Sequence, residues 1–219
     1  MKLLNKFAVC IYGQNEKFNL DFLKLLSNFF DGRAYLNILQ HCNHDECDSE
    51  FDYFCNLKNI NLFKAYSKNF DISDDLKLMY ILGNRVINYE TNSGVRFSHK
   101  LFINLRGIND FKFLENLIFT NYDSFQNISA NDRNIYFTTS DFFQEGLGFE
   151  KTLESINYNF LFGESYVMDV ALKAHKYYQH YTFGNSISSK FLGLQLSPVQ
   201  KFEQYCSCKF IKIVRYNPI

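Results

Sequence analysis

Polar side chains that could bind a charged ligand follow directly after an apolar run near the middle of the chain. Leu101–Leu105 is short and mostly apolar, typical of a strand covered on both faces of an α/β sheet. Arg106, Asn109 and Asp110 come next. Ligands of open α/β sheets bind outside the carboxyl ends of the strands, so this position favours a site for a charged substrate. The competing interpretation is a turn at Asn109 and Asp110 with a purely structural Arg106–Asp110 ion pair.

The amino-terminal segment predicts the first half of the sheet that would position these residues. Lys6–Tyr12 has the composition of a strand, and Gly13, Gln14 and Asn15 follow it as a tight turn. Phe18–Phe30 repeats apolar residues at helical spacing, and Ala34–Gln40 supplies a second strand. Together these elements predict a right-handed βαβ unit with parallel strands.

The turn at Gly13 lacks the glycine pattern of a dinucleotide fingerprint, and the chain contains no phosphate-binding loop of the Gly-x-x-x-x-Gly-Lys-Ser/Thr type. A nucleotide held by backbone N–H groups and side chains near Gly13, Gln14 and the following helix start stays open. Motifs for a serine nucleophile elbow, a His-Glu-x-x-His zinc helix and a Cys-x-x-Cys pair are also absent, which leaves a nucleophilic hydrolase unsupported.

The remaining elements continue the alternation of strands and helices. The acidic, polar segment Asp45–Phe54 predicts a surface loop, and Leu76–Glu90 predicts a helix with one apolar face. The other predicted strands are 59–65, 135–138, 157–163 and 209–214, and the other predicted helices are 165–181 and 200–206.

Length and composition indicate one folded domain without a general affinity for polyanions. The 219 residues are 47% hydrophobic and 21% charged, and no linker-like segment divides them. The formal net charge is zero, which does not favour nucleic acid as a partner. No apolar run reaches the roughly 18 residues of a transmembrane segment, and no signal sequence is evident, so we expect a cytoplasmic protein.

Six cysteines are expected to be reduced thiols. One cluster leaves two interpretations open, either a zinc site of irregular spacing or a solvated loop holding small core cysteines; its members are His41, Cys42, His44, Cys47 and Cys55. Cys206 and Cys208 alternate, which predicts two packing residues on one face of a strand.

Several segments, in this order, resemble a family of GT-A-like glycosyltransferases. Phe7–Gln14 is similar to the opening strand of that family, which ends in Ser-Gly-Gln, and Tyr35–His41 is similar to its second strand. Phe97–Asp110 resembles the strand that carries Arg-x-Arg-x-Asp, the element facing the metal and the nucleotide. Asn157–Asp169 resembles the later Asn-Asp-x-Phe, Phe-Gly and Met-Asp segment, and Ser197–Gln200 the closing Pro-Glu helix.

The resemblance implies a single GT-A-like, Rossmann-related α/β domain over residues 1–219, with a mostly parallel sheet flanked by helices. It also implies the transfer of a sugar from a nucleotide-sugar donor to a glycan or small-molecule acceptor, as in polysaccharide biosynthesis. Asp110 would hold Mg²⁺ or Mn²⁺, and Asn109 could add a neutral oxygen ligand. Arg106 or Lys17 would face the phosphates, and Gly13 and Gln14 would lie in the donor site.

Two carboxylates are candidates for the base that deprotonates the acceptor. Glu164 and Asp169 follow Gly163 in the segment that resembles the family, and a carboxylate near the acceptor hydroxyl can take its proton. The competing interpretation of Asp169 is a carboxylate in the first turn of a helix, where it interacts favourably with the helix dipole. Gly163 is equally explained as a turn glycine.

Three positions depart from the family pattern. Ile108 stands at the second arginine, Tyr158 at the acidic residue of Asn-Asp, and Glu16 at a position that is usually basic, although Lys17 is adjacent. The loss of charge-assisted contacts motivates an alternative, a catalytically inactive GT-A-like domain that binds a sugar nucleotide, a glycan or a protein partner. A plain structural or interaction protein that uses its aromatic surface is a third hypothesis.

Overall fold

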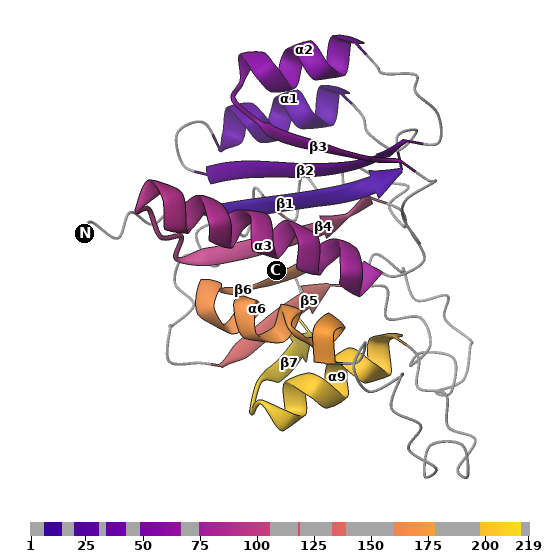
Figure 1. Cartoon of the computed structure of the whole chain (residues 1–219), viewed down its shortest axis with the longest axis vertical. Coiled ribbons are helices and arrows are strands. Elements are labelled where there is room, and N and C mark those ends of the chain that lie inside the picture. The colour runs from indigo at the N-terminus through magenta and orange to yellow at the C-terminus, as the bar shows by residue number, and fades with distance from the viewer. Residues whose placement is uncertain are drawn as a thin grey trace.

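The computed structural model describes residues 7–14, 20–30, 34–42, 49–66, 75–105, 118, 133–138, 160–177 and 198–215. Within these residues seven strands form one sheet in the order β3-β2-β1-β4-β6-β5-β7 (Figure 1). The strands are β1 (Phe7–Gln14), β2 (Ala34–Cys42), β3 (Asn61–Tyr66), β4 (His99–Asn104), β5 (Asn134–Thr138), β6 (Phe160–Glu164) and β7 (Lys212–Arg215).

The sheet is mostly parallel, as predicted. β1 pairs in parallel with β2 on one side and with β4 on the other, and β2 pairs in parallel with β3. β5 and β7 are also parallel to each other, whereas β6 lies antiparallel between β4 and β5. Among the described strands, β6 alone runs against the others. The parallel strands therefore share one carboxyl edge, and β6 ends at the opposite edge.

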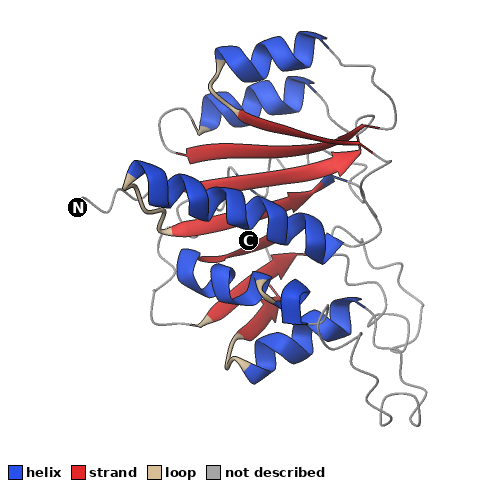
Figure 2. Ribbon diagram, in the orientation of Figure 1, coloured by secondary structure: helices blue, strands red, loops and turns tan. Residues whose placement is uncertain are grey.

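Helices cover both faces of the sheet (Figure 2). One layer contains α1 (Leu20–Phe29) and α2 (Ser49–Leu57), and the other contains α3 (Asp75–Ser93), α6 (Ser165–Leu172) and α9 (Pro198–Cys208). Strand alternation divides β1 between the two layers, because successive side chains point to opposite faces. Phe7, Val9 and Ile11 join the α1 and α2 layer, and Cys10 and Tyr12 join the α3 layer.

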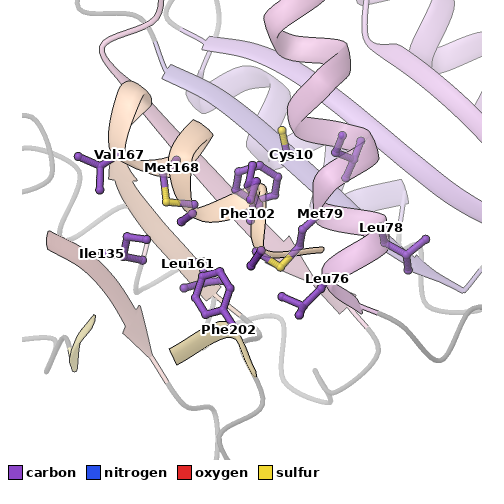
Figure 3. Packing of buried hydrophobic residues seen from close by; sticks show 14 of the residues in the cluster. Cys10, Leu76, Leu78, Met79, Phe102, Ile135, Leu161, Val167, Met168 and Phe202 are labelled. Carbon is purple, nitrogen blue, oxygen red and sulfur yellow. The ribbon is translucent and has the colours of Figure 1, made fainter. Parts of the chain in front are cut away.

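The core beneath α3, α6 and α9 draws on elements far apart in the sequence. Phe102 of β4 and Leu161 of β6 lie under Met79 of α3, Met168 of α6 and Phe202 of α9 (Figure 3). All five side chains are at most 1% exposed. The apolar spacing that predicted a helix over Leu76–Glu90 is explained by this packing, since the apolar face of α3 is buried on the sheet.

Two details of the sequence-based prediction are wrong. Ser49–Leu57 forms the helix α2 where a surface loop was predicted over Asp45–Phe54. Its Phe51, Phe54 and Cys55 recur at helical spacing and are buried against the sheet, while its acidic residues lie in the first turn, where they suit the helix dipole.

The second wrong detail concerns the two carboxy-terminal cysteines. Cys206 and Cys208 lie in the helix α9, not in a strand, so a spacing of two residues places them on different faces. Cys206 is buried in the core and Cys208 is exposed.

Candidate functional site

The chain adds its first strands on one side of β1 and its later strands on the other side, so the strand order reverses between β1 and β4. The chain leaves β1 through α1 to β2 and then through α2 to β3, always on one face and away from β1. It then returns through α3, on the other face, to β4 on the far side of β1. Connections of this kind leave a crevice outside the carboxyl ends of the two central strands, where open α/β sheets bind their ligands.

Gly13 and Leu105 lie side by side at this boundary. Tyr12 is paired with Asn104 in the parallel register, so the next residues along both strands are neighbours. A Cβ atom added at Gly13 would lie only 2.9 Å from the Cβ of Leu105. The glycine is therefore needed for the close approach of the two chain segments. The end of β1 and Leu105, the residue that precedes Arg106 in the sequence, are therefore neighbours at the carboxyl edge of the sheet.

Most of the predicted donor-site side chains lie outside the described residues. These are Lys17, Arg106, Asn109 and Asp110, together with the side chain of Gln14, whose backbone ends β1. What the structure places is the pair of strand ends that lead into them.

Asn104, the last residue of β4, is a polar side chain at this edge that the sequence analysis gave no role. It is 4% exposed, and its strand partner Tyr12 is fully buried. The available signal was a carboxamide near the end of an apolar strand, just before Arg106. It places a buried carboxamide at the carboxyl end of β4, next to the position of the candidate site.

The two predicted acceptor-side carboxylates lie at the other edge of the sheet. Because β6 is antiparallel to β4, Glu164 is paired with His99, the first residue of β4. Asp169 follows in the second turn of α6, so the interpretation of Asp169 as a carboxylate in the first turn of a helix is wrong. The structure therefore does not bring Glu164 or Asp169 together with Gly13.

The same two carboxylates also differ in the face of the sheet that they occupy. An added Cβ at Gly163 would lie 3.2 Å from Met168 of α6, so that position faces the α6 layer. Glu164, the next residue in the strand, faces the opposite layer. Asp169 lies on the α6 side. The two residues therefore do not form one acid–base pair.

Asp169 is engaged in an ion-pair network with a fully buried lysine. The Nζ atom of Lys100 lies 2.5 Å from Oδ1 of Asp169 and 3.3 Å from Oε2 of Glu90. The Lys100 side chain is 0% exposed, and those of Glu90 and Asp169 are 11% and 23% exposed. Oε1 of Glu90 accepts a further hydrogen bond from the backbone N–H of Phe97, at 2.9 Å. The network joins the end of α3, the start of β4 and α6.

Burial controls the titration of these carboxyl groups. Desolvation raises the pKa of Asp169 and outweighs the opposing effect of the Lys100 ammonium and its hydrogen bond. Desolvation alone raises the pKa of Glu164. Asp169 thus has the environment of a structural ion pair, because its carboxylate is already bound to a buried cation.

The sequence analysis did not assign Lys100 or Glu90 a role. The available signal was a lysine immediately before the apolar run 101–103, since a charged residue inside a buried strand requires partners. Its partners lie 10 and 69 residues away, and a single sequence does not identify them.

The predicted zinc cluster is described only in part. Cys55 lies in α2, buried, and burial raises its pKa to about 11. The side chains of the other members, His41, Cys42, His44 and Cys47, lie outside the described residues. Among the side chains that the structure does describe, no three His, Cys, Asp or Glu residues gather closely enough to hold a metal ion.

Comparison with protein-family models and with curated proteins finds no match for this chain. Within the described residues, no helix is both long and apolar enough to cross a membrane.

Proposed function

We propose that this chain is a GT-A-like glycosyltransferase that binds a nucleotide-sugar donor outside the carboxyl ends of β1 and β4. The single observation that supports it best is the reversal of strand order between these two strands. It places Gly13 beside Leu105, and these residues begin or precede the two sequence segments, 13–17 and 106–110, that resemble the donor site of that family.

The chemistry required at such a site is the stabilisation of negative charge. When the sugar is transferred, the diphosphate that leaves it gains charge, which basic side chains or a divalent cation must offset. Arg106 and Lys17 are the proposed basic groups. Asp110 and Asn109 provide carboxylate and carbonyl oxygens, the donor atoms that suit Mg²⁺ and Mn²⁺, and would hold the cation. A bound cation would supply Lewis-acid stabilisation of the leaving diphosphate.

The proposal assigns the acceptor base to neither Glu164 nor Asp169. Glu164 ends β6 at the edge opposite Gly13, and Asp169 is bound to Lys100. The base is instead expected among the residues that follow the carboxyl ends of the parallel strands, where the donor sugar would lie.

A thermal-shift panel tests this function. UDP-, GDP-, CMP- and dTDP-sugars are added with and without Mn²⁺ to the wild-type chain and to the Asp110→Asn and Arg106→Gln variants. Binding at 100 times Kd adds about 2.7 kcal/mol to the stability, which raises the Tm of a chain of this size by about 5–10 °C. The Asp21→Asn variant is the matched control, because the Asp21 side chain is 88% exposed on α1.

The expected result is a metal-dependent rise for one donor that is lost in Asp110→Asn and retained in Asp21→Asn. A rise that is independent of metal and of Asp110 would instead support the alternative, an inactive domain that binds a sugar nucleotide. An unchanged Tm with every nucleotide sugar would contradict both.

A further inference from the structure

The helices α3 and α6 cross at a glycine, which brings polar side chains of the two helices together. A Cβ atom added at Gly83 would lie 2.5 Å from Cδ1 of Leu172, so only a glycine permits this approach without a shift. Tyr80 lies about one turn before Gly83. His175 and Lys176 lie about one turn after Leu172, in the helical continuation of α6.

Two rings and one cation, those of Tyr80, His175 and Lys176, meet beside this crossing. The Nζ atom of Lys176 lies 5.2 Å from the centre of the Tyr80 ring. The ring centroids of Tyr80 and His175 are 5.6 Å apart, and His175 is 7% exposed. Lys173 and Lys176 are themselves exposed. Both lysines therefore present their charge to solvent, and Lys176 does so beside the partly buried Tyr80 ring.

The Tyr80 side chain lies in a positively charged and polar environment. Burial alone would raise the pKa of Tyr80, but hydrogen bonds from Lys176 and Asn84 and the charges of Lys176 and Lys173 together lower it. A phenolic hydroxyl has one proton to donate, and an anion bound beside Lys176 could accept it from Tyr80.

Neither lysine is neutralised by a close carboxylate of the described chain. The ion pairs found there within 4.0 Å involve Lys24, Lys64 and Lys100. The charge of Lys173 acts to lower the pKa of Asp169, but the ion pair of Asp169 is with Lys100. The cluster therefore has two positive charges and a phenolic donor, the set of groups that recognises a phosphate or a carboxylate.

The cluster lies toward the same edge of the sheet as the candidate donor site. α3 begins after β3 reaches the carboxyl edge, and it runs back to the start of β4. α6 begins after β6 reaches the opposite edge and runs the other way. Figure 1 shows the start of α3 and the end of α6 on the side toward which β1 points.

We propose that the crossing of α3 and α6 carries a second, anion-binding subsite, formed by Tyr80, Lys173 and Lys176, which takes a phosphate or carboxylate group of the acceptor. The inference rests on the proposed glycosyltransferase function and adds that the acceptor is acidic. The subsite belongs to the helical layer and not to the β1–β4 boundary, so it is separate from the site proposed for the donor diphosphate.

Calorimetric titration with inorganic phosphate and with glucuronate tests the subsite. The full chain is first saturated with Mg²⁺ and with whichever nucleotide gave the largest thermal shift, or is used alone if none did. The test variant combines Lys173→Gln with Lys176→Gln, and Tyr80→Phe removes only the hydroxyl. Lys24→Gln with Lys58→Gln is the matched control, because it removes two exposed lysines from the opposite helical layer.

We expect the wild-type chain and the control to bind the anion with the same affinity. In the test variant the affinity should fall about tenfold or more for each of the two lysines removed. Tyr80→Phe should also weaken binding, with the Tm of all variants unchanged. Phosphate binding alone assigns a phosphate group to the acceptor, and glucuronate binding with the same variant pattern assigns a carboxylate.

No binding of either anion, or equal binding by the two double variants, overturns the subsite. If the nucleotide-sugar shift is present in that case, the proposed function stands without it. Lysine-dependent anion binding in a chain that no nucleotide sugar stabilises would retain the anion site and refute its role with an acceptor.

Discussion

Gly13 of β1 faces Leu105, the residue after β4, so closely that no other residue fits at position 13 without a shift. The contact connects the first turn of the chain with the segment that leads to Arg106. It sets the geometry of the edge at which we place the donor.

We predict that Gly13→Ala lowers the free energy of unfolding by about 1–3 kcal/mol, because the added methyl group overpacks a buried position beside Leu105. Urea denaturation measures the loss. Gly163→Ala is the matched control and should cost less, since an added Cβ there would lie 3.2 Å from the Met168 side chain and 3.3 Å from the backbone oxygen of Asn134, farther than the 2.9 Å at Gly13. A Gly13→Ala variant as stable as the wild type would show that the two strand ends separate easily.

Lys100 should be necessary for stability. Lys100→Met leaves Glu90 and Asp169 without their buried cation, and breaking such a pair typically costs about 3–5 kcal/mol. Replacing all three residues, with Glu90→Gln and Asp169→Leu added, should restore most of the loss, because no unpaired charge remains. Denaturation curves of both variants test this. A single variant that loses less than about 1 kcal/mol would mean that water screens the network.

The buried carboxyl group of Asp169 should make stability depend on pH. Its pKa is raised in the folded chain, so its contribution is fully present below the unfolded value, about 3.9, and is lost as the pH rises through the folded pKa. Asp169→Asn should therefore flatten the fall in unfolding free energy over the mildly acidic range above pH 4 or so. Asp21→Asn, on an exposed side chain, should leave the slope unchanged. Equal slopes for Asp169→Asn and the wild type would contradict the prediction.

Thiol reactivity should follow burial. Burial raises the pKa of Cys10 and Cys206 to about 12 and that of Cys55 to about 11, whereas Cys208 is exposed. Iodoacetamide at pH 8, followed by peptide mapping, should modify Cys208 in the native chain and the three buried thiols only after denaturation. Rapid native modification of Cys10 would show that β1 is less protected than the structure indicates.

Local patterns in the sequence predicted most of the secondary structure. The apolar run at Leu101–Leu105 is buried throughout, and the helical spacing over Leu76–Glu90 became the buried face of α3. These predictions succeed because burial of one helix face, or of both strand faces, leaves a period in the sequence. α2 was predicted as a loop because the acidic residues of the segment were given more weight than its three apolar residues at helical spacing.

The direction of β6 was not predictable in the same way. Strand orientation depends on long-range pairing, and 21 residues lie between Thr138 at the end of β5 and Phe160 at the start of β6. Pairing Glu164 with His99 instead of placing it beside Gly13 moved one predicted site residue to the far edge. The Lys100 network was missed for a similar reason, since its two carboxylates come from separate helices.

Photoaffinity labelling with an azido-nucleotide sugar tests the central claim most directly, because it reports which edge of the sheet holds the donor. Digestion and mass spectrometry should find the label in peptides that contain residues 13–17 or 106–110, with Mn²⁺ increasing the yield and unlabelled nucleotide sugar abolishing it. Competable labelling of the peptide that contains Glu164 and Asp169, without labelling of the first two, would contradict the account.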